Sequence, residues 1–345
     1  MIQAEHLSKT YILRERNGLF RKRTRREVPA VKDISLEIPR GSITGVLGIN
    51  GAGKTTTIRM LASLIVPTSG TLTMDGIDAV KNHLQVKKRI NVITGGERNL
   101  YWRLTARENL RYFGNLYGLS GKTLEQRMDR LLSAVGLTEA QNTPVERYSK
   151  GMKQRLQIAR GLINDPDYLF LDEPTLGLDI LIAREIRELI RRLAQEQNKG
   201  VLLTTHYIRE AEELCDTIYL LEKGEVIARG TKEELTELFQ YKPRLAVQAD
   251  LPPDSPVWEA LKRRFPGNVQ LLPDQPGSFW VEGTAQIWSE VLNLLLAHQV
   301  PVEKLNIQEA NLEEVLTGIL RRSSTLRVEP DAVESTVSRR KEETI

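Results

Sequence analysis

The chain has 345 residues, of which 40% are hydrophobic and 27% are charged, an ordinary balance for a globular protein with a sizeable core. It has no apolar run of the roughly 18–20 residues that a membrane span needs, no apolar leader, and one cysteine, Cys215. These features exclude an integral membrane protein and an internal disulfide, and we expect a soluble, cytosolic chain. Residues 14–26 carry seven basic residues and one acidic residue, so against a net charge of +4 the rest of the chain is near −2. Because the basic residues form one local segment, nucleic acid is not expected as a partner.

Residues 1–235 alternate short β-like runs with helical patterns, which predicts an α/β domain with a mostly parallel sheet covered by helices on both faces. Apolar residues at helical spacing mark 55–65 and 185–197. Residues 113–162 show no strand pattern, which predicts a helical insert over about 96–162. The predicted strands are 2–7, 28–38, 43–47, 72–74, 90–93, 168–171, 201–205, 218–221 and 225–228.

The order of elements changes after residue 235, where proline-containing loops separate a β-α-β-β-α-β succession. This order is typical of the split-βαβ arrangement and predicts a small α+β accessory domain over 236–322. A tail over 323–345, polar and without apolar periodicity, is expected to be disordered. The predicted strands of the accessory domain are 245–249, 269–272, 279–282 and 302–307, and its helices are 258–264, 287–298 and 311–322.

The stretch GINGAGKT fits the phosphate-loop pattern G-x-x-x-x-G-K-[ST], between the apolar run ITGVL and an amphipathic helix. Glycines let the backbone curl so that its N–H groups point at phosphate oxygens, and the helix start adds its positive end. We expect Lys54 to reach the β- and γ-phosphates and the Thr55 hydroxyl to ligate Mg²⁺. The predicted nucleotide-binding residues of the loop are Gly48, Asn50, Gly51, Ala52, Gly53, Lys54, Thr55 and Thr56.

An acidic pair follows the apolar run YLFL in YLFLDEPT. The carboxyl end of a buried parallel strand lies beside bound phosphates, so Asp172 is expected to hold Mg²⁺ through its water shell. Glu173 is expected to act as general base on the attacking water. The alternative interpretation, an acidic pair that only marks a turn, is outweighed by the phosphate loop.

Further motifs narrow the class of nucleotide protein: YSKGM at 148–152, LGLD at 176–179 and the histidine of LLTTHY. Together they resemble the nucleotide-binding subunit of an ATP-binding cassette (ABC) transporter over residues 1 to about 235. The resemblance implies a RecA-like P-loop domain with an antiparallel β subdomain and a helical insert. It also implies that Tyr11 stacks on adenine and that His206 contacts the γ-phosphate. The residues that match the signature motif are Ser149, Lys150 and Gly151, and Asp179 matches the D-loop.

The resemblance implies a head-to-tail dimer with a second copy or a related ATPase subunit. Each ATP, with its Mg²⁺, would lie between the phosphate loop of one subunit and the Ser149–Gly151 turn of the other. A helix start after Ser149 offers N–H donors to a phosphate, which agrees with this role. An integral membrane permease would hold the dimer at the cytoplasmic face of the membrane.

The chain departs from the family at the coupling loop, where a glutamine is usual and Gly96 stands here, followed by Glu97. Either Glu97 substitutes for the glutamine or the water is held without this contact; we favour the substitution. Aromatic residues crowd the sequence that follows. We expect Tyr101 and Trp102 to face the membrane subunit, whereas Tyr112 and Phe113 are expected in the core of the insert.

Two segments have open interpretations. The basic segment is either a solvated loop or a contact for anionic lipid or the membrane subunit. The C-terminal domain, with its NLEEVLTGIL helix, resembles the appendage of exporters of drugs, antibiotics, polysaccharides and sodium, where a regulatory or dimer-supporting role is implied. The leading hypothesis is therefore an exporter ATPase. The alternatives are a soluble ABC ATPase acting on nucleic acid or ribosomes, an importer ATPase, and a catalytically inactive cassette.

Overall fold

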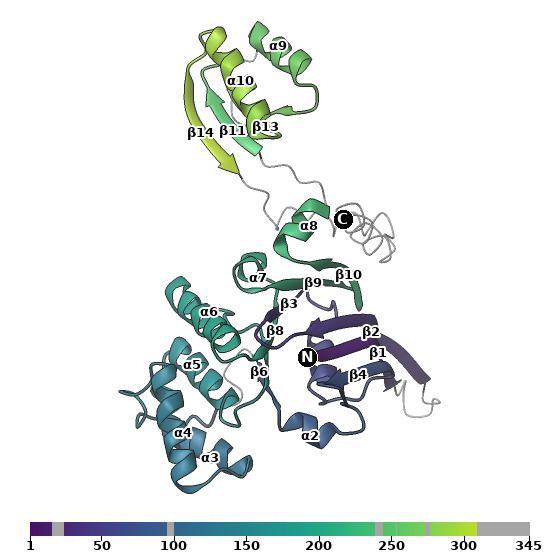
Figure 1. Ribbon diagram of the computed structural model, residues 1–345, viewed down its shortest axis with the longest axis vertical. Helices are drawn as coiled ribbons and strands as arrows, with labels where there is room; N and C mark the ends of the chain where they lie inside the picture. Colours follow the sequence, from purple (N-terminus) through teal and green to yellow (C-terminus); the bar gives the residue numbers. More distant parts are fainter. Residues whose placement is uncertain (16–23, 95–99, 239–243, 253, 273–276, 309–345) are drawn as a thin grey trace, which may run out of the picture. The chain divides into compact units, whose positions relative to one another are not determined.

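The computed structural model describes residues 1–15, 24–94, 100–238, 244–252, 254–272 and 277–308. They form two compact units, one spanning Met1–Lys232 and one that begins at Glu233 (Figure 1). None of the helices in these ranges combines the length and the apolar character that crossing a membrane requires.

A ten-stranded sheet in the described chain organises the first unit, in the order β5-β4-β1-β2-β10-β9-β3-β8-β7-β6. Strands β9, β3, β8, β7 and β6 run parallel to one another, whereas β5, β4, β1 and β2 pair antiparallel. The halves are joined at β10, which pairs antiparallel with β9 and meets β2 at Glu225 and Asp33. The strands are β1 (Ile2–Glu15), β2 (Thr24–Ile38), β3 (Ile43–Leu47), β4 (Ser69–Met74), β5 (Ile77–Asp78), β6 (Ile90–Thr94), β7 (Tyr168–Asp172), β8 (Gly200–Thr205), β9 (Thr217–Glu222) and β10 (Glu225–Gly230).

Helices connect the parallel strands, and three of them form the insert between β6 and β7 (Figure 1). Within 100–162 the structure has helices and turns, apart from an isolated bridge between Thr105 and Pro144, so the insert is helical as expected. The helices of the first unit are α1 (Lys54–Leu61), α2 (His83–Lys87), α3 (Ala106–Leu116), α4 (Gly121–Ala134), α5 (Lys150–Gly161), α6 (Ile180–Gln195) and α7 (Ile208–Leu214).

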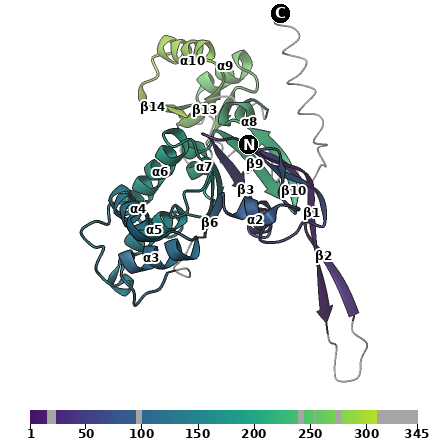
Figure 2. The same ribbon diagram turned by 60° about the horizontal axis from the view of Figure 1, so that its bottom comes forward.

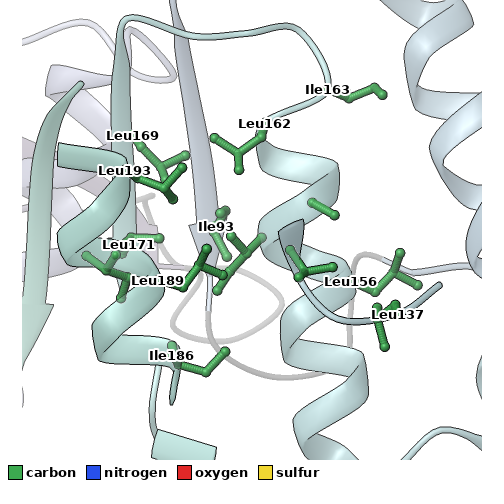
Figure 3. Close-up of a cluster of buried hydrophobic side chains, with 14 of the residues drawn as sticks. Ile93, Leu137, Leu156, Leu162, Ile163, Leu169, Leu171, Ile186, Leu189 and Leu193 are labelled. Atoms are coloured by element: carbon green, nitrogen blue, oxygen red, sulfur yellow. The ribbon is translucent and has the colours of Figure 1, made fainter. Parts of the chain in front are cut away.

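The central parallel strands β3, β7 and β8 are buried on both faces, which is why they read as continuous apolar runs. Along β7 the side chains alternate between two cores, because successive residues of a strand point to opposite faces. Tyr168 and Phe170 join the core beneath α1 and the antiparallel strands, whereas Leu169 and Leu171 join the core that α5 and α6 cover. Figure 3 shows this second core, with Leu189 and its neighbours on α6 turned toward the strands.

The second unit has the predicted β-α-β-β-α-β order and a four-stranded antiparallel sheet in the order β12-β13-β11-β14. Helices α9 and α10 pack over a core that includes Val247, Trp258 and Phe279. The split-βαβ prediction is therefore confirmed. The elements are β11 (Arg244–Ala249), α9 (Pro256–Arg264), β12 (Val269–Leu271), β13 (Ser278–Glu282), α10 (Ala285–Ala297) and β14 (Val302–Gln308), after α8 (Lys232–Leu238).

The largest difference from expectation is at the N-terminal strands. The segment 14–26 was expected as a loop, but residues 14–15 and 24–26 belong to strands, and Arg14 pairs with Arg25 in the register. β1 and β2 therefore continue beyond the other strands as a two-stranded ribbon (Figure 2). The short elements β5 and α2 were not predicted. The predicted helix 311–322 and tail 323–345 lie outside the described residues.

Candidate nucleotide site

The phosphate loop joins β3, which is buried along its whole length, to α1, which begins at Lys54. At Gly48 an added Cβ would lie 2.5 Å from the carbonyl oxygen of Leu221, and Gly53 has a φ of 107° that only glycine adopts freely. Both positions therefore require glycine. The result is a tight curl of backbone ahead of a helix start, the arrangement that binds phosphate.

Lys54 lies inside this curl and is only 6% exposed. Its Nζ donates hydrogen bonds to the carbonyl oxygens of Gly48, at 2.5 Å, and Ile49, at 3.3 Å. Burial lowers the pKa of the Lys54 ammonium, while the charges of Glu173 and Asp172 oppose that shift. A cation held against carbonyl oxygens and beside two carboxylates is placed to accept a polyanion.

Asp172 ends β7 between two threonines of the neighbouring strands, Thr94 on β6 and Thr204 on β8. The Thr204 hydroxyl donates to Asp172 Oδ1, at 2.5 Å. This contact orients the carboxylate at the edge of the sheet where the Lys54 loop also lies. The orientation was not predicted, although a hydroxyl at a strand end next to an acidic strand end is a readable signal.

Glu173 leaves the strand in a left-handed conformation, with φ of 52°, directly before Pro174. A non-glycine residue in this region costs about 1–3 kcal/mol and persists only where its surroundings hold it. Its N–H donates to the Thr204 carbonyl at 2.9 Å. The turn brings Glu173 Oε1 to 2.9 Å from Nδ1 of His206, which follows β8 directly.

The pair remains accessible, with 21% of the Glu173 side chain and 37% of the His206 side chain exposed. The imidazole packs on Tyr207, with 4.1 Å between ring centroids. The structure thus brings Lys54, Asp172, Glu173 and His206 together at the carboxyl ends of β3, β7 and β8, which is where ligands bind in open α/β sheets.

The other predicted nucleotide residues surround this edge in different environments. Gly51 and Asn50 are exposed, Ala52 is buried, Thr55 is exposed and Thr56 is half-buried. Tyr11 lies on the β1–β2 ribbon opposite Val28, half-buried, with Lys9 Nζ 5.7 Å from its ring centre.

The signature turn lies at the start of α5 in the insert. Ser149 caps the helix, and its hydroxyl accepts a hydrogen bond from the Met152 N–H at 3.2 Å. Gly151 is buried and packs closely against α6. An added Cβ at Gly151 would lie 2.7 Å from Ile182 Cγ2, so the position leaves no room for a side chain. The Lys150 side chain lies against Gly177 of the D-loop. A Cβ added at Gly177 would lie 2.2 Å from Lys150 Nζ.

Asp179 begins the neighbouring helix α6, with Oδ1 accepting from the Ile182 N–H at 2.9 Å. The signature turn and the D-loop are therefore neighbours within one chain. Among the described residues, no hydrogen bond joins Ser149 to Lys54 or to the phosphate loop.

Tyr101 and Trp102, which follow the coupling loop, form an exposed aromatic surface, and a buried asparagine beneath them holds their loop. Tyr101 is 47% and Trp102 48% exposed, and the Tyr101 hydroxyl donates to the Tyr112 hydroxyl at 3.1 Å. This bond raises the pKa of Tyr101. Phe113 is partly buried against the core as expected, but Tyr112 is 40% exposed, so its assignment to the core was wrong. Tyr112 packs edge-on to both aromatic neighbours at the surface instead.

The base of this surface is Asn109, a fully buried side chain whose role no sequence signal indicated. It accepts a hydrogen bond from the Tyr101 N–H at 2.8 Å and donates to the carbonyl oxygens of Tyr101, at 3.0 Å, and Thr105, at 2.9 Å. Gly96 and Glu97 lie outside the described residues.

The candidate ligands of the expected Mg²⁺ are Thr55 and Asp172. No group of three or more histidine, cysteine or acidic side chains suited to a metal occurs in the described ranges. Thr55 lies in the first turn of α1 and Asp172 ends β7; a hydroxyl and a carboxylate fit Mg²⁺, because Mg²⁺ is usually bound through few carboxylates together with substrate phosphates.

Comparison with known proteins decides the family. The family model described as "ABC transporter" matches residues 31–176. The chain is 39% identical over 329 residues to the linearmycin resistance ATP-binding protein LnrL of Bacillus subtilis, covering 94% of this chain and 99% of that protein. The chain belongs to the ABC transporter ATP-binding proteins.

Other members of the family are similar over the first unit. The ABC transporter ATP-binding protein NatA of Bacillus subtilis is 49% identical over 210 residues, 61% of this chain and 85% of that protein. A solved dimeric ATP-binding cassette, described as a post-hydrolysis state bound to ADP and Pi, matches 67% of this chain and 98% of its own with a TM-score of 0.58 and 27% identity.

As an ABC ATP-binding subunit, the chain is an ATPase that uses ATP and Mg²⁺. Subunits of this family dimerise and pair with membrane permeases. The RecA-like fold class expected from the sequence is confirmed.

Proposed function

We propose that the chain powers export of a substrate through a separate membrane permease, as one of two ATPase subunits bound at the cytoplasmic face of the membrane. The relatives support export: LnrL is named for linearmycin resistance, and DrrA of Streptomyces peucetius, 42% identical over 206 residues, for daunorubicin and doxorubicin resistance. The observation that carries the enzymatic part is the 2.9 Å pair of Glu173 and His206 beside the buried Lys54.

Hydrolysis follows from this arrangement. Lys54 and the loop N–H groups bind the β- and γ-phosphates, and the Lys54 ammonium leaves its carbonyl partners for phosphate oxygens. Glu173 takes a proton from the attacking water, and His206, oriented by Glu173, contacts the γ-phosphate. Thr55 and Asp172 would hold Mg²⁺, which would neutralise phosphate charge.

The second subunit completes the site. Ser149, Lys150 and Gly151 of one copy contact the γ-phosphate held by the phosphate loop of the other, and Asp179 lies along the same seam. The start of α5 at the Ser149 cap, which offers N–H donors to a phosphate, supports this arrangement. Lys150 stands where the family motif has glycine, so it adds a positive charge to the signature turn. Tyr11 stacks on the adenine of its own subunit.

Tyr101 and Trp102 form the surface that receives the permease, supported by their exposure and by the fixed loop beneath them. Glu97 takes the place of the usual glutamine and contacts Mg²⁺ or the nucleophilic water. An unchanged rate of ATP hydrolysis and of transport in Glu97→Ala would remove that role.

The basic segment 14–26 contacts anionic lipid, each basic residue near such a surface contributing about 1 kcal/mol. The second unit supports or regulates the dimer. Replacing the basic residues of the segment with glutamine should lower binding of the permease complex to vesicles that contain phosphatidylserine; unchanged binding would exclude lipid contact.

The test of the catalytic assignment is Glu173→Gln in the purified chain. We expect ATP hydrolysis to fall by about 10²–10⁴-fold with ATP binding preserved, because the amide cannot accept the proton. Glu188→Gln, an exposed glutamate on α6, is the matched control and should behave as wild type. Full turnover in Glu173→Gln would overturn the assignment, and export is tested by substrate efflux from cells that carry the chain with its permease.

A further inference from the structure

We propose that Glu210 is a positioning residue for ATP hydrolysis, which holds the Glu173 turn against the His206 segment through a hydrogen bond with Thr175. The proposal rests on the role of Glu173 as general base. Neither Thr175 nor Glu210 was predicted to take part in the site.

The contact is buried. Glu210, on α7, is 3% exposed and Thr175 is 7% exposed. The Thr175 hydroxyl donates to Glu210 Oε1 at 2.6 Å. The other carboxylate oxygen, Oε2, has no hydrogen-bond partner among the described residues. One hydrogen bond offsets only part of the desolvation cost of a buried carboxylate. Glu210 therefore does not stabilise the fold by its burial, and its presence needs another explanation.

The bond connects the two segments that carry the catalytic pair. Thr175 follows Glu173 by two residues after β7, and Glu210 follows His206 by four residues after β8. Beyond the β7–β8 pairing and the Glu173 N–H bond to the Thr204 carbonyl, two side-chain bonds join the segments, at Glu173 Oε1 to His206 Nδ1 and at Thr175 Oγ1 to Glu210 Oε1. The backbone pairing ends at Glu173, so the Thr175–Glu210 bond is what holds the turn beyond it to the helix that follows His206.

Glu173 needs this support because of its backbone. It is in the left-handed region directly before a proline, a backbone conformation that is energetically unfavourable for a non-glycine residue. Its carbonyl accepts from the Leu176 N–H at 3.2 Å, and the Thr175 carbonyl accepts from the Leu178 N–H at 3.1 Å, so Thr175 lies inside the turn that sets the Glu173 direction. Release of Thr175 would let the carboxylate move away from the attacking water.

The experiment measures kcat and KM for ATP in the purified full chain, with thermal unfolding of every variant. Glu210→Ala and Thr175→Val each remove the bond, and kcat should fall roughly ten- to a hundredfold with KM unchanged, the expected cost of a misplaced catalytic group. Glu210→Gln and Thr175→Ser keep an acceptor and a donor, so both should retain most of the wild-type kcat. Glu213→Ala, an exposed glutamate on the same helix, is the matched control.

The double variant separates positioning from general damage. If one bond carries the effect, Glu210→Ala with Thr175→Val should have the kcat of the single variants rather than the product of their losses. Glu210→Gln should also unfold at a temperature at or above that of the wild type, because it removes a buried charge.

Wild-type kcat in Glu210→Ala, or an equal loss in Glu210→Gln and Glu210→Ala that follows their unfolding temperatures, would overturn the proposal. Glu173→Gln, measured in parallel, distinguishes failure of the positioning role of Glu210 from failure of the general-base role of Glu173. If Glu173→Gln is inactive while Glu210→Ala is normal, only the positioning role fails. If Glu173→Gln turns over normally, the general-base assignment fails first.

Discussion

Replacing Asn109 with alanine should loosen the loop that carries Tyr101 and Trp102 while the nucleotide site stays intact. The substitution removes the acceptor of the Tyr101 N–H and the donor of two carbonyl oxygens, at distances of 2.8–3.0 Å. The site is fully buried, so water does not replace these partners without opening the loop.

The magnitude follows from the three bonds. At about 1 kcal/mol for each net hydrogen bond, the free energy of unfolding should fall by about 3 kcal/mol. For a unit of this size each 1 kcal/mol lowers Tm by about 2–4 °C, so we expect a fall of roughly 6–12 °C.

Thermal unfolding and amide hydrogen exchange check this prediction. Exchange should accelerate at residues 101–104 in Asn109→Ala, with basal ATP hydrolysis near wild type and coupling to the permease reduced. Asn115→Ala, an exposed asparagine on the same helix, is the control and should change neither quantity. A variant that unfolds and exchanges as the wild type does would refute the argument that Asn109 holds the loop.

Three further predictions concern other parts of the chain. Gly48→Ala should abolish ATP binding, measured by titration calorimetry, because its Cβ would lie 2.5 Å from the Leu221 carbonyl oxygen; ordinary affinity would contradict this. Burial alone would raise the pKa of Asp75, but hydrogen bonds, among them one from Arg40, hold it well below its ordinary value. A depressed pKa stabilises the fold above about pH 4, and that stability is lost as pH falls. Asp75→Asn should therefore weaken the dependence of the free energy of unfolding on pH between about pH 5 and 2. A pH dependence equal to that of the wild type would contradict this role of Asp75. Phe279→Ala should destabilise the second unit by about 3–5 kcal/mol in denaturant titration, since the ring is fully buried, and a shift below about 1 kcal/mol would count against its place in the core.

The catalytic edge could be predicted because its strands are buried on both faces. The four apolar residues YLFL precede Asp172, and the run VLLTT precedes His206. Both runs indicate buried strands whose ends share one edge of a parallel sheet. The split-βαβ unit was predictable from the order of its elements, since strand order in this arrangement follows from the connections.

Other features have no local signal. The ribbon residues 8–13 are mixed polar and apolar, and their strand depends on pairing with β2 rather than on their own pattern. The Thr175–Glu210 bond joins residues 35 positions apart, and Glu210 reads as one more polar residue on a short amphipathic helix. Tyr112 was placed in the core on composition, but helix geometry turns it to the surface while its neighbour Phe113 packs inward.

The single pair that joins β10 to β2 has a consequence for ATP binding. In the described residues Glu225 and Asp33 are the one pair of that register, and beside them the Gly224 carbonyl accepts from the Lys32 N–H while the Gly224 N–H donates to the Ala52 carbonyl. The phosphate loop is thus hydrogen-bonded to the turn at which β10 meets β2. We expect a nucleotide bound by the loop and by Tyr11 to add a second connection between the antiparallel strands and the parallel strands.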